Sequence, residues 1–308
     1  MIRSSNAWIV AGLLLVPTVD VARGAELSAE EKAAGFVSIF DGASLAGWVG
    51  ATDGYGVKDG AIVCLQEKGG NLFHEKQYAD FVLRFEVLIP PGGNNGIAIR
   101  SPQETGNLAF VGSEIQVLDD PHPMYAAVKD YQHHGSVYGV VPAKTGALKP
   151  AGEWNVEEIT VQGRHVKVVL NGTTIVDADL DEAAKDGTLD GRPHPGLSRT
   201  IGYIGFLGHG SPVAFRNLRI KDLLPADRRI DLTIEGAPDE AVQVWYRGDM
   251  ETGSAPLVFT GKLGVDGRVT ITVPRVYVLV GRPTRSGGIP MKLHEVQGNT
   301  ASVKLSAP

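Results

Sequence analysis

The chain has 308 residues, of which 43% are hydrophobic and 21% charged, with 39 glycines. This length allows one large domain and a smaller one, and the composition is that of a turn-rich globular protein without disordered or collagen-like bias. The net charge of −6 at pH 7 argues against nucleic acid or anionic lipid as partners.

The first 24 residues have the three parts of a secretory signal peptide. Arg3 supplies a basic start, residues 7–16 are apolar, and residues 22–24 (ARG) form a small-x-small cleavage site. The apolar run is shorter than the roughly 18 residues that a membrane helix needs, and no other stretch reaches that length. We therefore expect a secreted or periplasmic protein without a membrane span.

Residues 25–224 are expected to form mainly short β-strands. Ser28 and Glu31 have the spacing of a capping box, which predicts a short helix, and a second short helix is expected at residues 180–187. Elsewhere apolar and polar residues alternate between Gly, Asn, Asp and Pro, which predicts a sandwich or jelly roll. Asn171-Gly172 is the commonest two-residue hairpin turn. The expected strands lie within residues 80–90, 113–119, 157–163, 164–172, 174–180, 201–208 and 213–223.

A domain boundary is predicted near residues 222–231 (DLLPADRRID). Further short strands follow it, and residues 230–308 are enough for a small immunoglobulin-like sandwich. The predicted fold class is therefore all-β, with a jelly-roll sandwich followed by a small C-terminal β-sandwich domain. The single cysteine, Cys64, excludes an internal disulfide and is expected in the core.

Residues 90–102 (PPGGNNGIAIRSP) combine a turn with a strand that ends on a charged residue. Because side chains alternate across a strand, Ile97 and Ile99 would face the core, while Gly96 and Arg100 would face away from it. Small residues beside an arginine suggest space kept open for a ligand.

Two further strands place polar side chains away from the core. Glu114 and Gln116 alternate with apolar residues, and Trp154 shares a face with Glu158. An acid, an amide, a guanidinium and an indole on one sheet face would suit a sugar, whose ring stacks on aromatic side chains while its hydroxyls bind polar groups. The alternative is an ordinary solvated sheet face.

Histidines form a second group of candidates. His133 and His134 follow Asp119 in the chain, and His209 lies in the stretch GFLGHG. Imidazoles and carboxylates are general acid–base groups and also ligands for a divalent cation. The spacing matches no zinc signature, so a metal is left open, and no cofactor is predicted. A hydrogen-bonded structural role is the alternative for each histidine.

Seven motifs occur in an order that resembles the 3-keto-disaccharide hydrolase family, over about residues 35–224. They are GFVSIFDGASLAGW, GGNNGIAIRS, SEIQVLDD, SVYG, PAGEWNVEEITVQG, VVLNG and VAFRNLRIKDL. The resemblance implies a concanavalin A-like lectin/glucanase fold, a β-jelly-roll with two stacked sheets. The chain departs from the family where members usually read LQDHG: it reads FLGHG, which keeps His209 and loses the amide and the carboxylate.

The resemblance implies cleavage of glycosides whose sugar carries a 3-keto group. That carbonyl acidifies the hydrogen on C2, so a base can remove it, the C1 substituent can leave by elimination, and water can add afterwards. We expect Glu114 to be the base, Arg100 to stabilise the enolate, and His134 or His209 to donate the proton. The carbohydrate partner is expected to contact Gln116, Asp119, Tyr138, Trp154 and Asn155.

Three alternatives stay open at this point. Direct hydrolysis could use Glu114 and Asp119 as flanking carboxylates, but their five-residue offset would require a bend or bulge in the strand. A non-catalytic, lectin-like carbohydrate-binding module is the second. The third is an assembly or surface-interaction protein that docks through its C-terminal sandwich.

Overall fold

The computed structural model describes residues 26–103, 107–223, 229–246, 257–274, 278–281, 293–294 and 300–305. The predicted signal peptide lies outside these ranges. In the part of the chain that is described, no helix is both long enough and apolar enough to cross a bilayer.

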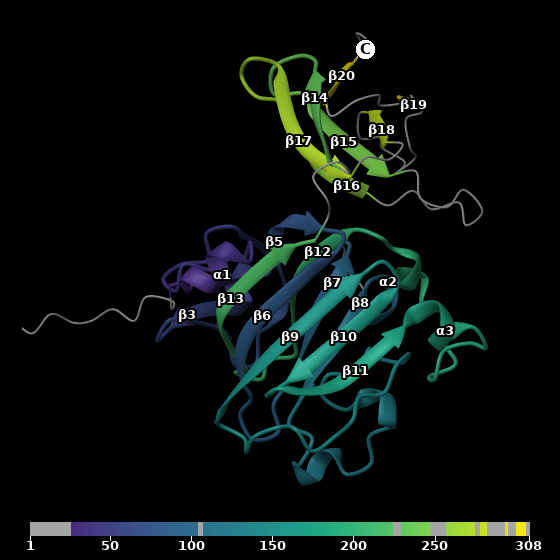
Figure 1. Cartoon of the computed structure of the whole chain (residues 1–308). Helices are drawn as coiled ribbons and strands as arrows, with labels where there is room; N and C mark the ends of the chain where they lie inside the picture. Colours follow the sequence, from purple (N-terminus) through teal and green to yellow (C-terminus); the bar gives the residue numbers. More distant parts are fainter. Residues whose placement is uncertain are drawn as a thin grey trace, which may run out of the picture.

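Two antiparallel sheets are stacked face to face and form the larger part of the molecule (Figure 1). The eight-stranded sheet has the order β11-β10-β9-β6-β13-β4-β3, with β1 paired to β13. Its strands are β1 (Val37–Ser38), β3 (Tyr55–Lys58), β4 (Ala61–Cys64), β6 (Phe81–Leu88), β9 (Trp154–Gln162), β10 (His165–Leu170), β11 (Thr173–Asp179) and β13 (Ala214–Asp222).

The second sheet has five strands in the order β2-β5-β12-β7-β8. Residues 134–138 run beside β8, where an isolated bridge pairs Val137 with Ile115, and so extend this sheet at its edge. The strands are β2 (Trp48–Gly50), β5 (Gly70–Tyr78), β7 (Asn94–Ser101), β8 (Ser113–Leu118) and β12 (Gly202–Gly208).

The apolar core between the sheets follows the predicted alternation. In β6, Phe81, Leu83, Phe85 and Val87 are buried in the core, whereas the residues between them are only partly buried. In β8, Ile115 and Val117 belong to the same core. The Cys64 thiol is buried and free, as predicted.

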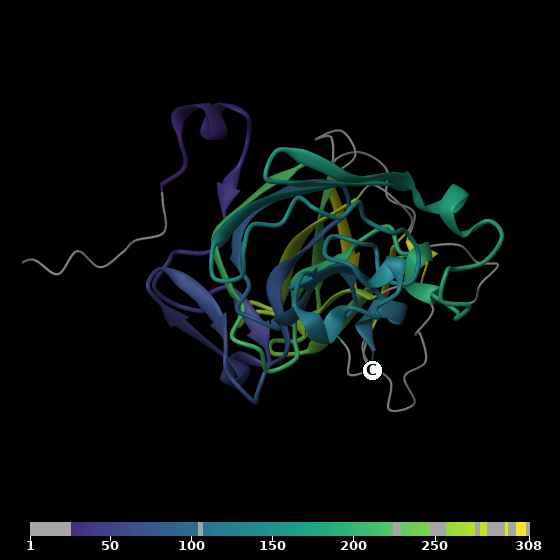
Figure 2. The ribbon, with the colours of Figure 1, turned by 90° about the horizontal axis from the view of Figure 1, so that it is seen from below.

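Helical turns are few and short. The Ser28 hydroxyl caps α1 (Ala29–Ala33) by accepting a hydrogen bond from Glu31 N, and Ser28 N donates to Glu31 Oε2, which confirms the predicted capping box. The remaining turns are η1 (Thr52–Gly54), α2 (Leu108–Val111), η2 (Pro123–Tyr125), η3 (Asp130–Gln132), α3 (Leu180–Ala184) and η4 (Pro195–Ser198). In Figure 2, the sandwich is seen from the end crossed by the loop that carries η2 and η3.

Two smaller sheets follow in the C-terminal segment, with strand orders β17-β14-β20 and β16-β15-β18-β19. They enclose their own apolar cluster, which includes Leu232, Ile234, Val242 and Val244. The all-β fold class, a jelly roll followed by a small β-sandwich, is therefore confirmed. The strands are β14 (Arg229–Glu235), β15 (Ala241–Tyr246), β16 (Leu257–Lys262), β17 (Arg268–Pro274), β18 (Val278–Gly281), β19 (Leu293–His294) and β20 (Thr300–Lys304).

Candidate active site

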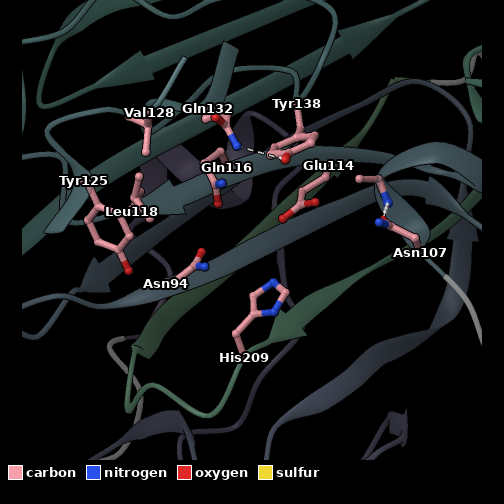
Figure 3. Close-up of a pocket in the computed structure, with 11 residues that line it drawn as sticks. Asn94, Asn107, Glu114, Gln116, Leu118, Tyr125, Val128, Gln132, Tyr138 and His209 are labelled. Atoms are coloured by element: carbon pink, nitrogen blue, oxygen red, sulfur yellow. Dashed lines mark hydrogen bonds between the residues drawn. The ribbon is translucent and has the colours of Figure 1, made fainter. Parts of the chain in front are cut away.

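A pocket of about 200 Å³ opens on the face of the five-stranded sheet that points away from the core (Figure 3). Strands β7 and β8 provide its floor, and the loop after β8 and helix α2 provide its walls. Its volume allows a ligand of about one ring, smaller than a drug-sized molecule. Its polar lining includes Asn94, Glu114, Gln116, Gln132, Tyr138 and His209.

Glu114 is the buried acid of this pocket. It is 7% exposed, and no described residue donates a hydrogen bond to its carboxylate. Gly96, on the neighbouring strand, makes room for it, because a Cβ atom at Gly96 would lie 2.1 Å from Glu114 Oε1. Burial raises the pKa of Glu114 to about 8, since desolvation disfavours the charged form. The carboxyl group is thus a strong base once it has lost its proton.

Three polar side chains surround Glu114 on the same face. Gln116 lies two residues along β8, and its Oε1 accepts a hydrogen bond from Val117 N at 3.0 Å, which leaves its amide nitrogen free to donate. Tyr138 N donates to the Glu114 carbonyl oxygen at 2.9 Å, so Tyr138 sits directly across from Glu114. The Tyr138 hydroxyl accepts a hydrogen bond from Gln132 Nε2 at 3.0 Å.

His209 follows β12 directly and lies at the mouth of the pocket. Its ring and the Glu114 carboxylate extend from two sides into the same space (Figure 3). Desolvation lowers the pKa of His209, whereas it raises the pKa of Glu114. Both shifts favour the uncharged form, so transfer of one proton from Glu114 to His209 gives the ionised base and the protonated imidazole that acid–base catalysis at this site would use.

The structure corrects the prediction for Arg100, which does not point toward the pocket. Its guanidinium donates to Ala79 O at 2.8 Å, to Gly163 O at 2.7 Å and to Asp80 Oδ1 at 2.8 Å. Its φ of +46° interrupts the regular strand, so the alternation rule fails at this position. Arg100 joins two turns and is not an enolate stabiliser.

His134 also lies away from the pocket, buried between the two sheets. Its Nε2 is 3.0 Å from Glu157 Oε2 on β9, and its Nδ1 accepts a hydrogen bond from Leu118 N. Gly135, with φ of +81°, turns the chain between His134 and the pocket face. His134 is therefore a structural residue, and of the two predicted proton donors only His209 reaches the pocket.

Asp119 supports the pocket from outside it. Its Oδ2 accepts a hydrogen bond from Gly92 N at 2.8 Å, which ties the end of β8 to the turn before β7. The Tyr125 hydroxyl donates to Gly92 O at 2.9 Å and fixes the following loop to the same turn. Since Asp119 does not line the pocket, the two-carboxylate arrangement with Glu114 is not formed.

The predicted roles of Trp154 and Asn155 are wrong because both residues lie on β9, in the eight-stranded sheet. Trp154 is on its outer face, where the Arg216 guanidinium stacks 4.0 Å from the ring centroid. Asn155 is buried, and its Oδ1 accepts hydrogen bonds from Lys149 N and from Asn171 Nδ2. Neither side chain lies on the sheet that carries the pocket.

Several pocket residues were not predicted from the sequence. Asn94 shares a face of β7 with Gly96, so the alternation that selected Gly96 could have found it. Its Oδ1 is buried without a described hydrogen-bond partner. Gln132 and Tyr125 come from an irregular loop, for which the sequence offered no periodic signal. Asn107 caps α2 at the pocket wall.

The divalent cation left open by the sequence has no evident set of ligands. Among the described residues, no group of three or more His, Cys, Asp or Glu side chains is arranged to hold a metal ion. The described groups that line the pocket include a carboxyl, an imidazole, hydroxyls and amides.

A β-jelly-roll with a small pocket of amides, tyrosines, an acid and an imidazole is typical of carbohydrate-active proteins. Residues 35–221 match the 3-keto-alpha-glucoside-1,2-lyase-like domain. The chain therefore belongs to that family, as its motifs predicted. It is also 30% identical over 229 residues to a 3-keto-disaccharide hydrolase of Bacteroides thetaiotaomicron, an alignment that covers 61% of this chain and 79% of that relative.

Solved structures agree with this assignment. Two crystal structures of candidate glycosyl hydrolases from Parabacteroides distasonis are similar to this chain. The first superposes with a TM-score of 0.57 at 29% identity. The alignment covers 64% of this chain and 98% of the chain in that crystal structure. The second superposes with a TM-score of 0.54 at 26% identity, and the alignment covers 61% of this chain and 99% of the chain in that crystal structure.

Proposed function

We propose that this protein cleaves glycosides whose sugar carries a 3-keto group, by removal of the C2 proton, elimination at C1 and hydration. The observation that carries the proposal is the buried Glu114 carboxylate, which faces His209 across a pocket for about one sugar ring. The family match supports the same class of substrate.

In the proposed reaction, Glu114 removes the C2 proton and the electron pair of that bond forms an enolate with the C3 carbonyl. The enolate then expels the oxygen at C1, which leaves a double bond between C1 and C2. His209 donates a proton to the leaving oxygen. Water adds across the double bond, with hydroxyl on C1 and hydrogen on C2, so the net reaction is hydrolysis without any change of oxidation state.

His209 lies across the pocket from Glu114, which favours an elimination in which the C2 proton and the C1 oxygen leave from opposite faces of the sugar ring. In an α-glucoside, the C2 hydrogen and the C1 oxygen point to opposite faces, as this arrangement requires. The proposal therefore extends to 3-keto-α-glucosides as the preferred anomers.

Purified protein with 3-keto-trehalose and with unoxidised trehalose tests the proposed activity. We expect glucose release only from the keto sugar, and a decrease of kcat/KM of about 10²–10⁴-fold in Glu114→Gln, the usual range for loss of a general base. Wild-type rates in Glu114→Gln would show that the base is another group.

A non-catalytic carbohydrate-binding module is the second candidate, and one observation favours it. Leu207, which stands where family members usually have an amide, packs in an apolar cluster with Phe73 and Tyr203. Calorimetry with oxidised and unoxidised sugars, together with an assay for released glucose, distinguishes the candidates. Binding without product would identify the binding module.

We further propose that the protein is exported, on the basis of its N-terminal sequence. The composition of residues 1–24 supports cleavage after Gly24. N-terminal sequencing of protein recovered from the periplasm or medium should begin at Ala25. An uncleaved chain confined to the cytoplasm would contradict this proposal.

A further inference from the structure

The pocket supplies a base and a proton donor, but the enolate oxygen on C3 also needs a hydrogen-bond donor. Arg100 is held elsewhere and cannot serve this purpose. None of the described residues that line the pocket is a lysine or an arginine. The donor must therefore be an uncharged hydroxyl or amide, or the imidazole at the pocket mouth.

The hydrogen bonds in the pocket show which hydroxyl can donate. The Tyr125 proton is already used, because its hydroxyl donates to Gly92 O at 2.9 Å. The Tyr138 oxygen instead accepts from Gln132 Nε2 at 3.0 Å. Since a phenol has a single proton, this bond leaves the Tyr138 proton available to a ligand. A donor to the phenol oxygen also polarises the O–H bond, which makes it a better donor itself.

The position of Tyr138 fits the geometry of a 3-keto sugar. The C2 hydrogen and the C3 oxygen are on adjacent carbons, so the group that binds the oxygen must lie next to the base. Tyr138 is opposite Glu114, because its N–H bonds to the Glu114 carbonyl and Val137 pairs with Ile115. Residues opposite each other on one sheet face have Cβ atoms about 5 Å apart. Gln116, two residues along β8, is about 7 Å from Glu114.

We propose that the Tyr138 hydroxyl donates the hydrogen bond that stabilises the enolate oxygen on C3, and that Gln132 is a positioning residue that holds this hydroxyl. This inference rests on the proposed function. As Glu114 takes the C2 proton, the carbonyl π pair moves onto the C3 oxygen, and Tyr138 keeps its own proton throughout. The charge returns to the ring when the C1 oxygen leaves.

Tyr138→Phe tests the role of the hydroxyl. We expect kcat on 3-keto-trehalose to fall by about 10²–10³-fold, the usual effect of losing one such donor, with KM changed by less than about threefold. Exchange of the C2 hydrogen with deuterium from D2O, followed by NMR, should fall by the same factor because it requires the same enolate. Tyr131→Phe is the matched control, since Tyr131 packs edge-on against Tyr138 and loses the same atom. It should behave like the wild type.

Gln132→Glu tests the positioning role. A glutamate of the same size accepts the Tyr138 proton instead of donating to the oxygen, so we expect a lower kcat with little change of KM. Combining it with Tyr138→Phe should cause no further decrease, because both changes remove one interaction. A role for Gln132 in folding alone would lower the melting temperature and leave kcat of the folded enzyme unchanged.

The outcomes separate this inference from the proposed function. If Tyr138→Phe exchanges the C2 hydrogen and cleaves 3-keto-trehalose at the wild-type rate while Glu114→Gln does neither, the inference is wrong and the proposed function stands. If the wild-type protein neither exchanges that hydrogen nor releases glucose, both are wrong. Circular dichroism of each variant confirms that the fold is retained.

Discussion

Residues of the same chemical kind have different roles in this protein because of their surroundings. Glu114 and Glu157 are both buried acids, but Glu157 is paired with His134 between the sheets, and Glu114 opens into the pocket. His209 and His134 differ in the same way. In the pocket, the Glu114 carboxylate and the His209 imidazole face the same space and are not paired with each other.

The raised pKa of Glu114 predicts how cleavage depends on pH. With a 4-nitrophenyl 3-keto-glucoside, the leaving group needs no proton from His209, so kcat/KM should rise with pH and level off above about 8. If Glu114 instead donates the proton to the leaving group, Glu114→Gln will cleave this substrate at nearly the wild-type rate. Initial rates between pH 5 and pH 10 distinguish the two roles.

The same pKa shift predicts a change of stability with pH. The folded state binds the Glu114 proton more tightly than the unfolded state, so wild-type stability should fall as pH rises from about 4.5, the ordinary pKa of a glutamate, to about 8. The Glu114→Gln variant should not lose stability in this way, because its side chain does not ionise. Thermal melts of both proteins should therefore differ more at pH 9 than at pH 5, with the variant gaining relative stability. A difference that is constant with pH would contradict the assigned pKa.

At the level of single strands, the alternation of side chains predicts some positions correctly and others wrongly. The alternation of side chains correctly placed Glu114 and Gln116 on the pocket face of β8, and Ile115 and Val117 on its core face, because β8 is a regular strand. The alternation within a strand does not indicate which sheet the strand joins. Trp154 was therefore predicted to lie on the same sheet as Glu114, whereas it lies on the eight-stranded sheet.

The rule also failed where the backbone leaves the extended region. Arg100 and Gly135 both have positive φ, which interrupts the alternation of side chains at each of them. The loop that carries Gln132 has no period at all, so its contribution to the pocket depends on tertiary contacts. The sequence therefore predicted the fold class and part of the pocket floor, but not the pocket walls.

Arg100 joins the end of β7 to two turns, and its loss should affect stability rather than substrate binding. Arg100→Met should lower the free energy of unfolding by about 3 kcal/mol, because it removes the hydrogen bonds of a buried guanidinium and takes the ion-pair partner from Asp80, which keeps the hydrogen bond from Gly163 N. The folded enzyme should keep its KM. Lys185→Met, in the exposed pair with Glu182, is the control and should cost less than about 1 kcal/mol. Urea denaturation and steady-state kinetics measure both effects.

At the scale of the whole molecule, the described pocket is built from residues between positions 94 and 209. The family match ends at residue 221, and the C-terminal sheets enclose an apolar cluster of their own. This separation supports the proposal that residues 230–308 form a separate domain for docking or stability.

Deletion of residues 230–308 tests that division. We expect kcat and KM on 3-keto-trehalose to stay within about twofold of the full-length values, since no described residue of the pocket is removed. A large loss of kcat from a truncated protein with a native circular dichroism spectrum would show that the C-terminal segment takes part in catalysis.

None of the described residues that line the pocket is a lysine or an arginine, and this also restricts which sugars can enter. A uronic acid or a sugar phosphate would have to bury its negative charge without a described lysine or arginine beside it, and above about pH 8 it would also meet the ionised Glu114. The chain as a whole already carries a net charge of −6. The protein should therefore discriminate against acidic glycans and process neutral ones from a mixed pool.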